Sequence, residues 1–210
     1  MRLIGVLMLL AGCDVGSPAT PDTPGGPGDG SQHDLGMFVA WNANPALPGM
    51  LTDKITVSEA TFQLDHFQVV ADAGSVTRSK YLLSWTPGGM PQQDVFPDAP
   101  PGVYSKIALV MMGGNLGNDA YQIRGTWRDN GITKPFEIHD RGQLGISIDC
   151  NATLSGGGEA TIAIKVNLAD AIGRIDFRGL DEDNGVLQLD TGQELADFRG
   201  RLKDAFQLDD

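Results

Sequence analysis

Residues 103–111, Val103-Tyr104-Ser105-Lys106-Ile107-Ala108-Leu109-Val110-Met111, alternate between apolar side chains and the residues that separate them. In an extended strand, successive side chains point to opposite faces, so Val103, Ile107, Leu109 and Met111 share one face. Residues 159–166 repeat this alternation. Both segments therefore predict strands with one side in a core and the other toward water.

The same period-2 pattern predicts further strands along the chain. They cover residues 37–42, 55–64, 67–71, 80–85, 120–128, 132–139, 144–149 and 186–189. Between Leu64 and Phe67 the apolar face shifts by one residue, which predicts a β-bulge at Asp65-His66. Short strands separated by Gly and Pro predict a mainly β fold class: a single antiparallel β-sandwich with a short C-terminal helix.

Turns and helices have their own signals. Asn130-Gly131 and Asn184-Gly185 predict tight hairpin turns, because Asn and Gly readily adopt positive φ angles. Leu168, Ile172 and Ile175 recur at helical spacing. Near the C-terminus, Thr191 and Glu194 fit a capping box ahead of a helix. Its apolar positions are Leu195, Phe198, Leu202 and Phe206.

The N-terminal residues have the layout of a secretory signal. Arg2 precedes a short apolar run that ends in small residues and Cys13. Leu10-Ala11-Gly12-Cys13 resembles the lipobox of bacterial lipoproteins. The resemblance implies a signal peptide over residues 1–12, cleavage after Gly12, and a diacylglycerol group on Cys13. The alternative is an ordinary secretory signal in which the cysteine is incidental.

Residues 13–34 differ in composition from the rest of the chain. Pro and Gly dominate this segment, and large apolar side chains are almost absent. Such a segment cannot offset its ordering entropy by burial, so we expect a disordered linker after the lipidated cysteine. The remaining residues, 35–210, are enough for one β-sandwich domain with a sizeable core.

Charge and cysteine content limit the partners of this domain. The net charge is −12, and removal of Arg2 with the signal makes it −13. An acidic surface argues against a nucleic-acid partner. If Cys13 is acylated, Cys150 has no disulfide partner, and we expect it to be a buried small apolar residue and not a nucleophile.

The segment before the first quoted strand adds a second resemblance. Pro100-Pro101-Gly102-Val103-Tyr104 is similar to a signature of transthyretin-like or immunoglobulin-like β-sandwich domains in bacterial surface proteins and lipoproteins. We expect Pro101-Gly102 to form a turn and the Tyr104 hydroxyl to hydrogen-bond back across the corner. The resemblance supports the fold and implies no mechanism.

Catalytic motifs are absent from the sequence, including nucleophile elbows, Walker loops and zinc-protease helices. His33, His66 and His139 are the only histidines. His139 precedes Asp140, but neighbours on a strand point to opposite faces. We therefore predict that the chain is not an enzyme and has no catalytic residue.

Two weaker ligand signals remain. Asp181 and Asp183, in the run before Asn184-Gly185, offer the oxygen ligands that calcium prefers, although their spacing fails the EF-hand loop. The sequence indicates no cofactor other than this possible Ca²⁺, and a solvated acidic turn is the alternative interpretation of the run. Trp41, Trp85 and Trp127 would favour a glycan platform if they clustered on an exposed face.

These observations together predict a bacterial envelope lipoprotein, anchored to the membrane through its lipid on the periplasmic face or cell surface. We expect its non-catalytic domain to bind an envelope protein or glycan, or to act structurally. The alternative is an envelope enzyme acting on polysaccharide, or an accessory carbohydrate-binding subunit. A calcium-stabilised adhesin is a third reading.

Overall fold

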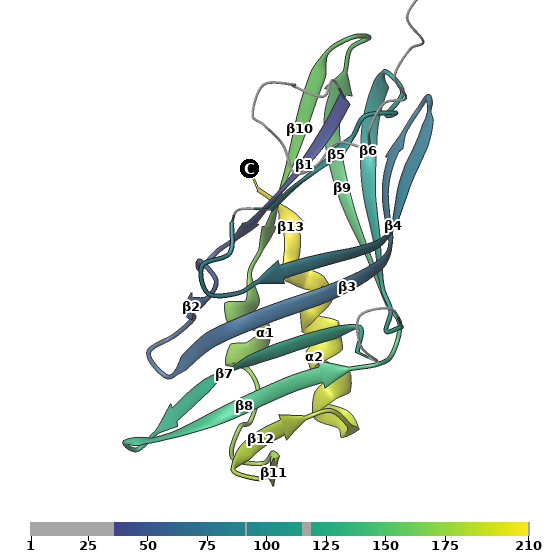
Figure 1. The fold of residues 1–210 in the computed structure, drawn as a ribbon. Helices are drawn as coiled ribbons and strands as arrows, with labels where there is room; N and C mark the ends of the chain where they lie inside the picture. Colours follow the sequence, from purple (N-terminus) through teal and green to yellow (C-terminus); the bar gives the residue numbers. More distant parts are fainter. Residues whose placement is uncertain (1–35, 91, 115–118, 210) are drawn as a thin grey trace, which may run out of the picture. The chain divides into compact units, whose positions relative to one another are not determined.

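Strand β6 (Gly102–Met111) forms where residues 103–111 predict a strand, in the larger of two sheets (Figure 1). Ile107, Leu109 and Met111 are buried, as their alternation requires. Val103, which the sequence places on the same face, is instead 42% exposed, and Tyr104 is buried. A bulge explains the difference, because the register of β6 against β9 shifts just after Tyr104.

The computed structural model describes residues 36–90, 92–114 and 119–209, which all belong to one compact unit, residues 34–210. The predicted signal peptide, Cys13 and the predicted linker lie outside the described residues. Within the described part the chain is mainly β, with two sheets and two helices. Neither helix is long and apolar enough to cross a membrane.

The small sheet has the strand order β13-β10-β1-β5. Its strands are β1 (Gly36–Ala43), β5 (Gln92–Phe96), β10 (Glu159–Val166) and β13 (Phe206–Leu208). The large sheet has the order β11-β12-β8-β7-β3-β6-β9, and β2 and β4 also pair with β3. Besides β6, it contains β2 (Gly49–Met50), β3 (Ile55–Ala71), β4 (Gly74–Trp85), β7 (Tyr121–Asp129), β8 (Ile132–Asp140), β9 (Leu144–Leu154), β11 (Asp181–Asp183) and β12 (Val186–Leu189).

Both sheets are mixed, so the prediction of strictly antiparallel strands is wrong. β1 runs parallel to β10, from Gly36 opposite Glu159 to Ala43 opposite Val166. β12 runs parallel to β8. Hairpin turns fix the direction of strands that follow each other in the chain. These two pairs join distant segments, and period-2 alternation carries no information about their direction.

The two sheets pack through aromatic side chains on their facing sides. The ring centroids of Trp41 on β1 and Phe67 on β3 lie 5.3 Å apart. Phe96 on β5 lies 5.0 Å from Phe67, and Phe206 on β13 lies 5.5 Å from Phe62. All five rings belong to one buried core. The packing is therefore β-sandwich-like over this part of the large sheet.

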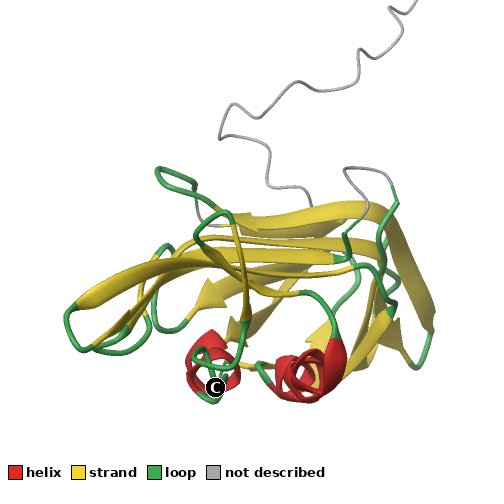
Figure 2. Cartoon of the chain, turned by 90° about the horizontal axis from the view of Figure 1, so that it is seen from below, coloured by secondary structure: helices red, strands yellow, loops and turns green. Residues whose placement is uncertain are grey.

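The helices extend the cover over the large sheet. They are α1 (Leu168–Gly173) and α2 (Gly192–Asp204), and Figure 2 shows both on one side of the strands. The ring of Phe198 on α2 lies 6.0 Å from that of Tyr121 on β7. Strand β7 therefore buries part of its inner face against α2.

The two helices begin differently. Asn167 caps α1, and its side chain accepts a hydrogen bond from the Ala169 amide at 3.1 Å. Thr191 is the N-cap of α2 as predicted, but its side chain makes no capping hydrogen bond. Glu194 accepts a hydrogen bond from Arg201 at 2.9 Å, so it does not complete the predicted capping box. Phe206, predicted in this helix, belongs to β13.

The predicted turns and bulge are confirmed. Asn130 and Asn184 have φ angles of 48° and 50°, and the glycine after each has a φ of 84°. The register of β3 against β6 shifts between Leu64 and His66, at the predicted bulge. The Tyr104 hydroxyl donates a hydrogen bond to the Pro100 carbonyl at 2.7 Å, which confirms the expected contact across the corner.

Candidate functional site

The β7–β8 hairpin carries the first candidate site. Its two-residue turn places Trp127 opposite Lys134 and Asp129 opposite Ile132. Side chains alternate along each strand, so all four residues lie on the same face of the sheet. Closer to the centre of the sheet, the residues on this face are buried. With Phe177, Arg178 and Leu187, they line a depression of about 250 Å³, which we call the hairpin groove.

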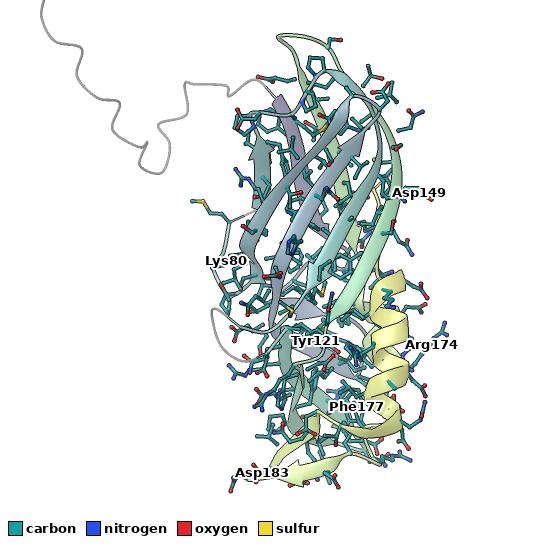
Figure 3. The ribbon with its side chains drawn as sticks, turned by 90° about the vertical axis from the view of Figure 1, so that its right-hand side faces the viewer. Lys80, Tyr121, Asp149, Arg174, Phe177 and Asp183 are labelled. Carbon is teal, nitrogen blue, oxygen red and sulfur yellow. The ribbon has the colours of Figure 1, made fainter. Side chains whose placement is uncertain are left out.

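The floor of the hairpin groove is aromatic, and Trp127 supplies its accessible ring because Phe177 is only 3% exposed. The rings of Trp127 and Phe177 are stacked, with centroids 5.5 Å apart and planes 16° from parallel. Phe136 lies 5.1 Å from Phe177 and is fully buried. Gly125 makes room for it, because a Cβ there would lie 2.6 Å from the Phe136 ring. Figure 3 shows Phe177 toward the end of the domain that carries Asp183.

The rim of the hairpin groove is polar. Arg178 donates to Asp129 Oδ2 from Nε at 2.9 Å, and its Nη2 lies 2.7 Å from the same oxygen. Lys134 forms an ion pair with Glu182 on β11. The arrangement joins a flat apolar surface to fixed hydrogen-bonding groups, which is typical of small-molecule sites.

A second depression, of about 290 Å³, lies where the parallel strands β8 and β12 end. It is lined by His139, Asp140, Arg141, Asp190 and Thr191, and we call it the His139 pocket. Parallel strands end at the same edge of a sheet, so His139 and Asp190 meet there.

His139 is held from two sides. Its Nδ1 lies 3.4 Å from Asp119 Oδ1, and its Nε2 lies 3.8 Å from Asp190 Oδ2. Asp119 Oδ1 also accepts a hydrogen bond from Arg141 Nε at 3.3 Å. A carboxylate that orients an imidazole is one component of acid–base sites. The described residues contain no group of three His, Cys, Asp or Glu side chains placed to hold a metal ion.

Asp140 points away from His139, as neighbours on a strand must. Its carboxylate is buried, accepts the Gly142 amide at 2.8 Å, and lies 3.1 Å from Arg199 Nε on α2. Burial raises the pKa of the Tyr121 hydroxyl above its ordinary value, and the negative charge of Asp140 raises it further. These contacts attach α2 to the loop after β8.

The predicted calcium ligands Asp181 and Asp183 lie on β11 and are exposed. Asp183 accepts a hydrogen bond from Asn184 at 3.0 Å, and the intervening Glu182 pairs with Lys134. An acidic strand with these local contacts does not by itself form a cation site. Calcium binding at Asp181 and Asp183 remains a prediction.

The other singled-out residues are dispersed. Trp41 and Trp85 are buried and Trp127 is half-buried, so the three tryptophans form no common exposed platform. His66 pairs with its neighbour Asp65 at 2.7 Å. The Cys150 thiol is half-buried and lies 3.5 Å from the Tyr104 carbonyl. Its pKa is raised by burial and then by the charge of Asp149, which disfavours the reactive thiolate.

Comparisons of the chain with protein-family models, with curated proteins and with solved structures found no match.

The hairpin groove was missed by sequence reasoning, although a signal for half of it was present. The Asn130-Gly131 turn fixes the register, and period 2 then puts Trp127, Asp129, Ile132 and Lys134 on one face. Phe177 and Arg178 follow α1, in a loop that no pattern places against this hairpin.

Proposed function

We propose that the chain is a lipid-anchored bacterial envelope lipoprotein whose β-sandwich domain has a non-catalytic binding or structural role. The observation that carries the proposal is the tetrapeptide Leu10-Ala11-Gly12-Cys13 at the end of a short apolar run. In this proposal residues 1–12 are removed, Cys13 carries the lipid, and residues 13–34 are a disordered linker. A lipid with two or three chains would hold the domain at a membrane surface.

The hairpin groove supports the binding role. Its lining joins aromatic and aliphatic side chains to a paired carboxylate and guanidinium, and contains no histidine, cysteine or serine. This composition suits recognition, and the two titratable groups that could act as base or nucleophile, Asp129 and Lys134, are both held in ion pairs.

The anchor is tested by metabolic labelling of the full chain with palmitate, followed by membrane fractionation. The Cys13→Ser variant should lose both the label and the membrane association. The matched control is Cys150→Ser, which removes the only other cysteine and should keep both. Labelling of Cys13→Ser at the level of the unchanged chain would refute the proposal.

The binding role is tested by crosslinking in intact cells, with capture of the attached envelope protein or glycan. The same experiment should be repeated with substitutions throughout the hairpin groove. If the partner is still captured, binding belongs to another surface of the domain. A domain that captures nothing would have to be structural.

An envelope enzyme acting on polysaccharide, or an accessory subunit of one, is the second candidate. It is favoured by the His139 pocket, where an imidazole lies between two carboxylates in a depression of about 290 Å³. Release of reducing sugar from purified envelope polysaccharide, abolished by His139→Gln and unaffected by His66→Gln, would establish it. Without such release, the non-catalytic proposal stands.

The calcium-stabilised adhesin is tested separately. We expect millimolar calcium to leave the melting temperature of the protein unchanged, because Asp181 and Asp183 are exposed and contact only local partners. A rise of several degrees that disappears in Asp183→Asn would instead establish a calcium site.

A further inference from the structure

We infer that the hairpin groove binds one pyranose ring of a polysaccharide, with the ring stacked on the accessible part of Trp127 and its hydroxyls bonded to the rim. This inference rests on the proposed binding role and names its ligand class.

Trp127 occupies the open end of an otherwise buried face. On the same face of β7, Tyr121, Ile123 and Gly125 are buried, whereas Trp127 is half-buried. Within the described residues its indole N–H has no hydrogen-bond partner, and it is not among the buried unpaired polar atoms. An aromatic surface with a free donor at its edge matches a pyranose, which has apolar C–H faces and hydroxyls around its circumference.

The rim has unused hydrogen-bonding capacity beside this surface. Arg178 and the side chain of Asn130 both bond Asp129 through Oδ2. Among the described residues no group donates to Oδ1 of Asp129, which leaves that oxygen free to accept a hydroxyl. A hydroxyl both donates and accepts, so adjacent sugar hydroxyls fit a carboxylate beside a guanidinium.

The loop that carries Phe177 and Arg178 is held by its own hydrogen bonds. The Phe177 amide donates to the Ile175 carbonyl at 3.1 Å, and the Arg178 amide donates to Asp176 Oδ1 at 3.2 Å. The Gly179 amide donates to the Asp176 carbonyl at 3.0 Å. A preformed site loses little conformational entropy when a ligand binds.

The charges at the hairpin groove favour a neutral ligand. Arg178 is matched by Asp129, and Lys134 is matched by Glu182. Among the residues that line the groove, no cation is left in excess to attract a phosphate or a carboxylate, and no anion is left to attract an amine. The groove volume of about 250 Å³ accommodates a single ring rather than a folded partner.

The test is calorimetric titration of the full chain, extracted in detergent, with cellotetraose, chitotetraose and maltotetraose at millimolar concentrations. At least one of these probes should bind. Trp127→Ala should weaken its binding by about tenfold or more, because the ring loses its stacking surface.

A second variant guards against a loss of folding in Trp127→Ala. Ile132 is 64% exposed at the mouth of the groove, so Ile132→Arg should block binding without disturbing the core. Its matched control is Thr126→Arg, an exposed position on the outer face of β7, which should bind as the unchanged chain does.

Failure of all three probes to bind, or equal binding by Ile132→Arg and Thr126→Arg, would overturn the inference. Crosslinking from position 132 to an envelope protein would also overturn it, in favour of a protein ligand. Palmitate labelling separates the two proposals, because a labelled chain that binds no sugar keeps the anchor and loses only the glycan site.

Discussion

At the scale of single residues, Tyr104 and Tyr121 are both buried, but only the Tyr104 hydroxyl makes a regular hydrogen bond. Tyr104 donates to the Pro100 carbonyl at 2.7 Å, whereas the Tyr121 hydroxyl lies beside the Asp140 carboxylate without a hydrogen bond of regular geometry. Tyr104→Phe should therefore lower the free energy of unfolding by about 1 kcal/mol, and Tyr121→Phe should change it by less than about 0.5 kcal/mol. Urea denaturation at neutral pH measures both values, and equal losses would contradict the assignment.

Asp94 is the least exposed charged residue among the described residues. It is 2% exposed, accepts the Trp41 indole N–H at 3.0 Å, and pairs with Arg78 at 2.9 Å. Asp94→Ala leaves the indole donor buried without a partner, while half-exposed Arg78 can turn to water. We expect a loss of about 2–3 kcal/mol in the free energy of unfolding.

The control for this substitution is Asp98→Ala, which removes an exposed carboxylate near the end of the same segment. Urea denaturation should place Asp98→Ala within about 0.5 kcal/mol of the unchanged chain. A similar small effect of Asp94→Ala would show that the buried network does not stabilise the fold.

Residue contacts were predictable only where they are local. The Tyr104 contact spans four residues and follows from Pro100-Pro101-Gly102, so the sequence indicates it. Asp94 has partners 53 and 16 residues away, on different strands. Nothing in the pattern around Asp94 distinguishes it from an exposed aspartate.

At the scale of elements, the β7–β8 hairpin depends on its turn. Gly131 has a φ of 84°, where a Cβ is unfavourable, so Gly131→Ala should cost about 1 kcal/mol. Gly145→Ala on β9 is the matched control, because a Cβ there meets nothing within 4 Å. Thermal unfolding should show a lower melting temperature for the first variant alone, and equal melting temperatures would refute a strained turn.

Elements were predicted well where local pattern determines them and poorly where distant partners do. The hairpins at Asn130 and Asn184 follow from residues that tolerate positive φ. Strand β5 was missed, because Gln92–Phe96 has only Asp94, Val95 and Phe96 in or near the core and no clear alternation of apolar residues. It becomes a strand by pairing with β1. The parallel pairs β1–β10 and β8–β12 likewise arise only from tertiary contacts.

The candidate site shows the same division. The hairpin supplies Trp127 and Asp129 by a register that the turn fixes. The loop after α1 supplies Phe177 and Arg178, and its position depends on how α1 packs beneath the sheet. Half of the hairpin groove therefore follows from the sequence, and the other half requires the fold.

At the scale of the whole molecule, the large sheet shares one hydrophobic core with both the small sheet and the helices. The small sheet covers β3 and its neighbours, while α2 covers part of β7. The hairpin groove lies where neither cover reaches, at the end of β7 and β8. Trp127 is half-buried there, whereas Tyr121, Ile123 and Gly125 on the same face of β7 are buried.

All three tyrosines of the chain have pKa values raised above the ordinary 10.0, chiefly by burial. Between that value and the higher native pKa, the unfolded chain loses these protons while the native state keeps them. The free energy of unfolding should therefore be fully present below about pH 10 and fall above it, by about 1.4 kcal/mol per pH unit for a tyrosine that stays protonated in the native state.

The Tyr121→Phe substitution removes the contribution of the buried Tyr121 hydroxyl to this pH dependence. Urea denaturation should find this variant equal to the unchanged chain at neutral pH and more stable at about pH 11. Parallel stability curves for the two proteins across this range would show that folding does not hold the Tyr121 proton.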